Sequence, residues 1–259
     1  MTNNLPLENQ VVFITGATSG FGEATARLLF ANGAKLIIAG RRQERLEKLK
    51  DELGANKIHT IKLDVTNNDQ IIKAVNNLPD EFSNINALIN NAGLALGLEP
   101  AHQCNLENWD RMIDTNIKGL TYCTRAILPN MVKRDNGYII NIGSIAGNYA
   151  YPYSNVYGAS KAFVHHFSLN LRADLSGTKV RVTSIAPGIA ETEFSIVRFK
   201  GNEEKAKKIY EKTLALTAND IAETILWCLT RPEHVNINNL EIMPTCQSFA
   251  ALSVIRNQE

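Results

Sequence analysis

The sequence lacks a long apolar run, a net charge of either sign and the pattern of a targeting segment. No part of its 259 residues approaches the ~18 consecutive apolar residues of a membrane span. The 27 basic residues nearly balance the 26 acidic ones and are scattered, so no overall field attracts nucleic acid or an acidic membrane. Residues 1–10 lack the basic and then apolar segments of a signal peptide. We therefore expect neither nucleic acid nor a membrane as partner.

Cysteine is also scarce, and its spacing matches no common metal pattern. The four cysteines are Cys104, Cys123, Cys228 and Cys246. They form no C-x-x-C pair and no Cys/His spacing typical of a metal site, so no metal is expected. Free thiols are typical of proteins in a reducing compartment, which predicts a cytoplasmic location.

Short apolar runs rich in β-branched residues alternate with helical patterns along the chain. Strands are expected at 11–14, 36–39, 59–63, 87–89, 138–142, 180–185 and 240–243. Helices are expected at 23–32, 42–53, 69–78, 157–175, 203–213 and 218–229, and at 106–133 with interruptions near Gly119 and Pro129. Such alternation predicts an α/β fold with a doubly wound parallel sheet covered on both faces. Because no linker or repeat is visible, we expect one domain over residues 1–259.

Three glycines follow the first expected strand. Gly16, Gly20 and Gly22 stand between that strand and a helix, where the backbone can approach a pyrophosphate. A helix N-terminus adds unpaired N–H groups and a positive dipole end. The spacing is G-x-x-x-G-x-G rather than the common G-x-G-x-x-G. A nucleotide site is predicted, and a glycine turn without a ligand is the alternative.

The residues after the second expected strand indicate which nucleotide would bind. A protein that binds NAD usually has Asp or Glu there to hold the ribose hydroxyls. This chain has Gly40, Arg41 and Arg42 instead. Guanidinium groups suit a 2′-phosphate, so the sequence favours NADP over NAD. The alternative is that both arginines are solvated residues at the start of a charged helix.

Tyr157 and Lys161 are four residues apart in an expected helix, which places them on one face. A phenol beside a lysine cation is favoured in its charged form, so we expect the pKa of Tyr157 to fall below its usual ~10. That shift would suit proton transfer at neutral pH. Chance can also supply such a pair, and an amphipathic helix with a surface lysine is the alternative.

These motifs occur in an order that resembles the short-chain dehydrogenase/reductase family. The set comprises Thr15-Gly16-x-x-x-Gly20-x-Gly22, Asn90-Asn91-Ala92-Gly93, Asn116, Ser144, Tyr157-x-x-x-Lys161 and Pro187-Gly188. The resemblance covers essentially the whole chain and implies a single Rossmann-fold domain. It also implies an NADP-dependent oxidoreductase that acts on CH–OH groups.

The resemblance implies a role for each of four polar residues. Tyr157 would be the catalytic acid and base, and Lys161 would lower its pKa and hold the nicotinamide ribose. Ser144 would hydrogen-bond the substrate oxygen, and Asn116 would help to hold a proton-relay water. Asn116 pairing only with backbone and Ser144 capping a strand end remain alternatives.

The resemblance also implies the cofactor contacts. Asp64 and Val65 would contact adenine, although Asp64 capping the next helix is an alternative. Asn91 to Gly93 would line the cofactor cleft, and Pro187, Gly188, Ile189 and Thr192 would hold the nicotinamide end. The implied cofactor-binding residues are Gly16, Thr18, Ser19, Gly20, Phe21, Gly22, Arg41, Arg42, Asp64, Val65, Asn91, Ala92, Gly93, Tyr157, Lys161, Pro187, Gly188, Ile189 and Thr192.

The substrate is expected under a loop at about 189–215, together with Ser144 and Tyr157. Arg198 and Lys200 would suit a carboxylate, or they belong to a solvated charged run. Segments 40–46, 99–102, 197–201 and 247–250 resemble the branch of the family that acts on 3-hydroxy acids with NADP, known for serine and allo-threonine dehydrogenase and malonic semialdehyde reductase activities. This closer resemblance implies a small 3-hydroxy acid or its oxo acid or semialdehyde as substrate. It also implies a homotetramer, with residues 236–259 near a subunit contact.

Three other functions compete with this interpretation. A serine hydrolase elbow needs glycine two residues before and after the nucleophile, but Ile142 and Ala146 flank Ser144 in that way. A carbonyl reductase for other ketones or aldehydes remains an alternative. A non-catalytic NADP-binding sensor is another, although it would not need Ser144, Tyr157 and Lys161 together.

Overall fold

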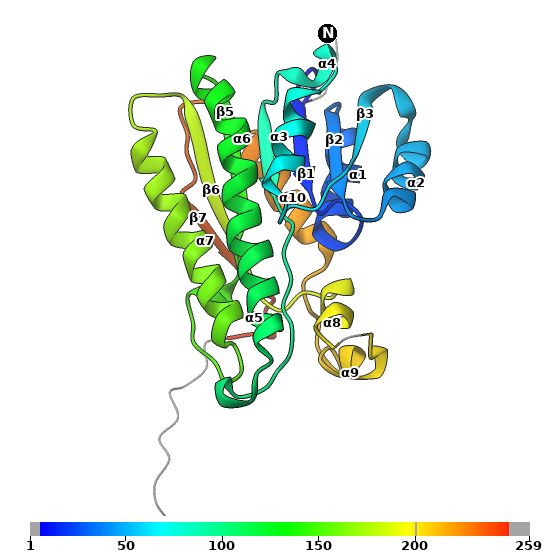
Figure 1. The fold of residues 1–259 in the computed structure, drawn as a ribbon, viewed down its shortest axis with the longest axis vertical. Helices are drawn as coiled ribbons and strands as arrows, with labels where there is room; N and C mark the ends of the chain where they lie inside the picture. Colours follow the sequence, from blue (N-terminus) through cyan, green and yellow to red (C-terminus); the bar gives the residue numbers. More distant parts are fainter. Residues whose placement is uncertain (1–5, 200, 249–259) are drawn as a thin grey trace, which may run out of the picture.

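A computed structural model describes residues 6–199 and 201–248, which form a seven-stranded parallel sheet (Figure 1). The strand order is β3-β2-β1-β4-β5-β6-β7. The strands are β1 (Val11–Thr15), β2 (Lys35–Gly40), β3 (Ile58–Lys62), β4 (Ala87–Asn90), β5 (Gly137–Ile142), β6 (Val180–Pro187) and β7 (Asn239–Ile242). The order reverses between β1 and β4, as in a doubly wound fold. The predicted fold class and all seven strands are thus confirmed.

Helices cover both faces of the sheet. One face packs on α1 (Gly20–Ala31), α2 (Gln43–Leu53) and α10 (Ala218–Leu229). The other packs on α3 (Asn68–Asn76), α4 (Asp80–Ser83), α6 (Leu120–Lys133) and α7 (Asn155–Asp174). In β1, Val12 and Ile14 point into the first core, whereas Val11 and Phe13 point into the second. Burial on both faces explains why the strands read as continuous apolar runs.

Several shorter elements complete the fold. They are α5 (Leu106–Ile113), α8 (Glu193–Arg198), α9 (Glu203–Lys208), the 3₁₀ turns η1 (Ala55–Lys57), η2 (Ala101–Gln103) and η4 (Ile145–Gly147), and the π-helical turn η3 (Asp114–Gly119). In Figure 1, α8 and α9 lie next to each other beyond one end of the sheet. None of the helices in the described part of the chain has the length and apolar character needed to cross a bilayer.

The structure corrects several predicted helix boundaries. The segment 193–198, expected as loop, is α8, and the helix expected over 203–213 ends at Lys208. The expected interruption at Pro129 is absent, because α6 continues through it with Ile127 and Met131 buried in the core. The expected interruption near Gly119 is confirmed, because the π-helical turn η3 ends at that residue. Thr217 caps α10 with a capping box.

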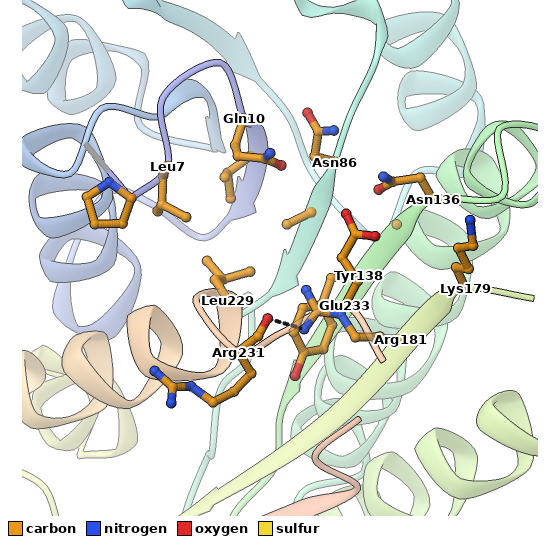
Figure 2. Close-up of a pocket in the computed structure, with 14 residues that line it drawn as sticks. Leu7, Gln10, Asn86, Asn136, Tyr138, Lys179, Arg181, Leu229, Arg231 and Glu233 are labelled. Atoms are coloured by element: carbon orange, nitrogen blue, oxygen red, sulfur yellow. Dashed lines mark hydrogen bonds between the residues drawn. The ribbon is translucent and has the colours of Figure 1, made fainter. Parts of the chain in front are cut away.

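A cavity of about 130 Å³ lies at the amino-terminal edge of the sheet (Figure 2). The Arg181 guanidinium lies 4.0 Å from the centre of the Tyr138 ring and donates from Nη1 to the Arg231 carbonyl oxygen at 3.2 Å. Arg181 is therefore held by structural contacts. The glycine turn lies at the opposite, carboxyl-terminal edge of the strands.

Candidate active site

The candidate site is built on the glycine turn after β1. Gly16 and Gly20 have φ values of +67° and +54°, which favour glycine. A Cβ on Gly22 would collide with the Gly16 carbonyl oxygen and the Asn91 Nδ2 atom. Gly20 and Gly22 belong to the first turn of α1, which begins three residues earlier than predicted. The turn thus places bare backbone at a helix N-terminus, as a phosphate site requires.

Residues at the end of β4 hold this turn in place. Asn91 Nδ2 donates to the carbonyl oxygens of Thr15 and Gly16 at 3.0 and 3.2 Å. The Thr15 hydroxyl accepts from the backbone N–H groups of Asn91 and Ala92, each at 3.0 Å. The side chain of Asn91 therefore shapes the cradle. Phe21, expected at the cofactor, is partly buried and packs against the first core.

Arg42 lies beside the turn, with its guanidinium bound to several oxygen atoms. Its Nε and Nη2 atoms donate to the Thr18 hydroxyl at 3.1 and 2.8 Å, and Nη2 also reaches the Ser19 hydroxyl at 2.8 Å. The close approach of β2 to the turn requires Gly40, because a Cβ there would lie 2.8 Å from Thr18 Cγ2. The alternative of a freely solvated Arg42 is therefore wrong in this structure. Its Nη1 atom lies 3.2 Å from Glu193 Oε2.

Arg41 borders a separate pocket of about 350 Å³ at the end of β3. The lining residues are Arg41, Lys62, Leu63, Asp64 and Gln70. Arg41 and Lys62 are both exposed cations, so this pocket suits an anionic group. Lys62 and Gln70 were not among the residues named from the sequence. A lysine at a strand end carries no distinctive signal in a single sequence.

Asp64 and Val65 have different surroundings. Asp64 Oδ1 accepts from the backbone N–H and the hydroxyl of Thr66 at 3.0 and 2.9 Å. The alternative that Asp64 caps α3 is wrong. Asn67 is the cap residue of that helix, because its side chain accepts from the Gln70 N–H. Val65 is buried against Gly119. Of Asp64 and Val65, only Asp64 lines the pocket next to Arg41.

Tyr157 lies near the start of α7 in a small apolar cluster. Its cluster includes Leu94, Met112 and Ala146, with Phe194 packed against it. The rings of Tyr157 and Phe194 have centres 5.8 Å apart, and the Arg198 guanidinium lies 5.8 Å from the Tyr157 ring centre. The tyrosine is thus enclosed by α8, an element that the sequence did not reveal.

The environment of Tyr157 differs from the sequence prediction. Burial raises the pKa of Tyr157 to about 12, although a hydrogen bond with Ser144 and the charge of Arg198 act in the opposite direction. The predicted fall of this pKa below its usual value is therefore wrong for this structure, because burial outweighs the groups that lower it. The protonated phenol is the state that can protonate a carbonyl oxygen, and the phenolate is the state that can accept a hydroxyl proton.

Lys161 is buried one helical turn from Tyr157. Its Nζ atom donates to the Ile142 carbonyl oxygen at 2.8 Å and lies 6.0 Å from the centre of the Tyr157 ring. Burial also lowers the pKa of Lys161 to about 8. Its burial contradicts the alternative of a surface lysine.

Asn116 and Ser144 both have structural partners. The Asn116 side chain accepts from the Leu94 N–H and donates to the Leu94 carbonyl, each at 2.9 Å, and donates to the Ser160 hydroxyl at 3.0 Å. Ser144 Oγ accepts from the Ala146 N–H at 3.1 Å, capping η4. A Cβ on Gly93 would lie 3.3 Å from Asn116 Oδ1 and 3.4 Å from Lys161 Nζ. Gly93 thus lets both side chains lie close to its backbone.

The segment after β6 closes over this site. Gly188 donates to the Ile242 carbonyl oxygen at 2.7 Å, and the Ile189 N–H donates to Gln247 Oε1 at 2.8 Å. Thr192 caps α8, and its side chain faces Gly20 across the glycine turn. Arg198 at the other end of α8 has a buried Nε without a hydrogen-bond partner. Pro187 ends β6 and is buried.

Two of the predictions concern residues that the structure does not describe. Lys200 lies outside the described residues, as does the part of the expected subunit contact beyond residue 248. Across the described residues, no group of three or more His, Cys, Asp or Glu side chains is placed to hold a metal ion.

Comparisons with known proteins agree with this geometry. Residues 10–203 match the family model described as short chain dehydrogenase. The chain is 59% identical over 248 residues to an NADP-dependent 3-hydroxy acid dehydrogenase, YdfG, of Salmonella typhi, covering 95% of this chain and all of the relative. It is 51% identical over 245 residues to serine 3-dehydrogenase of Agrobacterium fabrum, covering 95% and 98%. A closed form of serine dehydrogenase complexed with NADP⁺ superposes with a TM-score of 0.95 at 57% identity, covering 96% and 100%. The chain therefore belongs to the short-chain dehydrogenase family.

Proposed function

We propose that this protein is an NADP-dependent oxidoreductase that interconverts a small 3-hydroxy acid and its oxo acid or semialdehyde. The observation that carries the substrate class is Arg198, whose guanidinium lies over the Tyr157 ring with a buried, unpartnered Nε. A carboxylate is the natural partner for such a donor. The names of the relatives, a 3-hydroxy acid dehydrogenase and a serine dehydrogenase, support the same substrate class.

The residues present suit NADP. The glycine turn leaves no room for a Cβ at Gly22, so backbone can approach a pyrophosphate. Arg41, Arg42 and Lys62 supply positive charge where a 2′-phosphate would lie. We assign Asp64 and Val65 to the adenine side, Asn91, Ala92 and Gly93 to the cleft, and Pro187, Gly188, Ile189 and Thr192 to the nicotinamide end.

When bound, NADP supplies the acceptor or donor of hydride, and the protein positions and polarises the substrate. Tyr157 gives its proton to the carbonyl oxygen in reduction, or takes the hydroxyl proton in oxidation. Ser144 donates a hydrogen bond where alkoxide charge develops. Lys161 holds the ribose, and Asn116 helps to hold a relay water beside it.

Arg198→Gln tests the substrate class. We expect kcat/KM for a 3-hydroxy acid to fall about 10- to 100-fold, because a hydrogen bond to a charged group contributes about 1.5–3 kcal/mol. Reduction of a simple uncharged ketone should change little, since it has no carboxylate to lose. Steady-state kinetics on both substrates gives the comparison. Equal losses on both would assign Arg198 a structural role and remove the support for an acid substrate.

We also propose a single domain over residues 1–259 with its substrate loop at about 189–215, a homotetramer and a cytoplasmic location. The four cysteines are free, and free thiols are typical of reducing compartments. The family resemblance is the support for the tetramer. Light scattering coupled to size-exclusion chromatography measures the assembly.

A further inference from the structure

Glu193, the first residue of α8, is joined to two arginines far away in the sequence. Its Oε2 atom lies 3.2 Å from Arg42 Nη1, and both carboxylate oxygens lie 2.9 Å from Arg45 Nη1. Arg42 precedes α2 and Arg45 belongs to its first turn. This carboxylate therefore fastens α8 to the start of α2, across the glycine turn.

The carboxylate is charged at neutral pH. Partial burial opposes ionisation, but hydrogen bonds from Arg45 and Arg42 hold the pKa of Glu193 below its usual value. All three side chains keep roughly two fifths of their surface exposed. A single exposed ion pair contributes little to stability, but here one carboxylate binds two guanidinium groups.

Arg42 has little capacity left for another anion. Its Nε and Nη2 atoms are used by Thr18 and Ser19, and its Nη1 atom faces Glu193. A 2′-phosphate bound at Arg42 would lie near the Glu193 carboxylate on the same guanidinium. Two anions that share one cation repel each other, so Glu193 opposes the phosphate.

The two ends of α8 serve two sites. Glu193 starts the helix at the arginines, the adjacent Phe194 contacts the Tyr157 ring, and Arg198 ends the helix over the same ring. A six-residue helix is short, so fixing one end also fixes where the other end lies. The contact at Glu193 therefore determines how Arg198 is presented to Tyr157.

We propose that Glu193 is a positioning residue with two effects. It holds α8 over Tyr157 so that Arg198 meets the substrate, and it weakens the preference for NADP over NAD by competing with the 2′-phosphate for Arg42. The proposal rests on the proposed function of Arg42 and Arg198. It makes Glu193 a determinant of both cofactor preference and substrate affinity.

Glu193→Gln isolates the charge, and Glu191→Gln is the matched control because the Glu191 side chain is exposed and forms no ion pair among the described residues. We expect the ratio Kd(NADH)/Kd(NADPH), measured by cofactor fluorescence, to rise about threefold in Glu193→Gln and to stay unchanged in the control. A purely structural role would change both dissociation constants equally. An unchanged or lower ratio would overturn the competition.

The tether is tested by a double-mutant cycle on KM. With saturating NADP⁺, Glu193→Ala should raise KM for a 3-hydroxy acid about threefold. Arg45→Ala should raise it by less, because Arg42 still holds Glu193. The double variant should match Glu193→Ala, because no contact between Glu193 and Arg45 is left to lose. Additive effects, or no effect, would overturn the tether. Arg42→Ala is measured in parallel. If it does not weaken the binding of NADPH more than that of NADH, the proposed cofactor site is wrong. If it does weaken the binding of NADPH selectively, an unchanged Kd(NADH)/Kd(NADPH) ratio in Glu193→Gln rejects only the proposed role of Glu193, and the cofactor site stands.

Discussion

Tyr157→Phe is expected to lower kcat by about 10²- to 10⁴-fold, the range that a positioned proton donor contributes. The variant keeps the ring that packs against Phe194 and removes only the hydroxyl. NADPH should therefore bind with nearly unchanged affinity. Turnover is measured from NADPH absorbance and binding from NADPH fluorescence.

Tyr122→Phe is the control for this change. Tyr122 lies on α6 and packs against the second core, outside the cluster that holds Tyr157. It should retain full activity. Substantial turnover by Tyr157→Phe would remove Tyr157 from the proton transfer, and loss of NADPH binding would show that the variant disturbs the site.

The double variant Arg41→Ala with Arg42→Ala should lose affinity for NADPH by about 10²-fold or more, because each guanidinium contributes about 1.5–3 kcal/mol to a charged partner. NADH has no 2′-phosphate, so its affinity should change little. Binding of both reduced cofactors, followed by fluorescence, gives the selectivity directly.

Arg125→Ala serves as the control for loss of an exposed arginine, since Arg125 lies on α6 away from the turn. An equal loss of affinity for both cofactors in the double variant would mean that the two arginines support the fold of the turn. A wild type that prefers NADH would contradict the cofactor assignment itself.

The sheet could be predicted from sequence because each strand is buried on both faces and follows a simple pattern. Val11 to Ile14 alternate between two cores and therefore appear as one apolar run. Helix α8 could not be predicted in this way. It has six residues, and it is placed by the Thr192 cap and by Phe194 packing on Tyr157, which are contacts between distant parts of the chain.

In the candidate site, too, some features could be predicted from the sequence and others depend on contacts between distant parts of the chain. The glycine turn and the positions of Tyr157 and Lys161 follow from local spacing, and the structure brings them to one edge of the sheet. The spacing of Tyr157 and Lys161 did not reveal that both are buried or that Lys161 Nζ is directed to the Ile142 carbonyl. It therefore gave the wrong direction for the pKa of Tyr157, which burial raises. Glu193 carries no motif, and only its position beside Arg42 and Arg45 draws attention to it.

The central claim is tested most directly by assaying the wild-type protein on a small panel of substrates. L-Serine, L-allo-threonine and 3-hydroxypropionate are each supplied with NADP⁺ or NAD⁺, and a simple ketone is supplied with NADPH. We expect at least one hydroxy acid to reduce NADP⁺ and to prefer it to NAD⁺, with Tyr157→Phe inactive. Failure of all three acids while the ketone is reduced would contradict the proposed substrate class, and NADPH binding without turnover of any compound would favour a sensor.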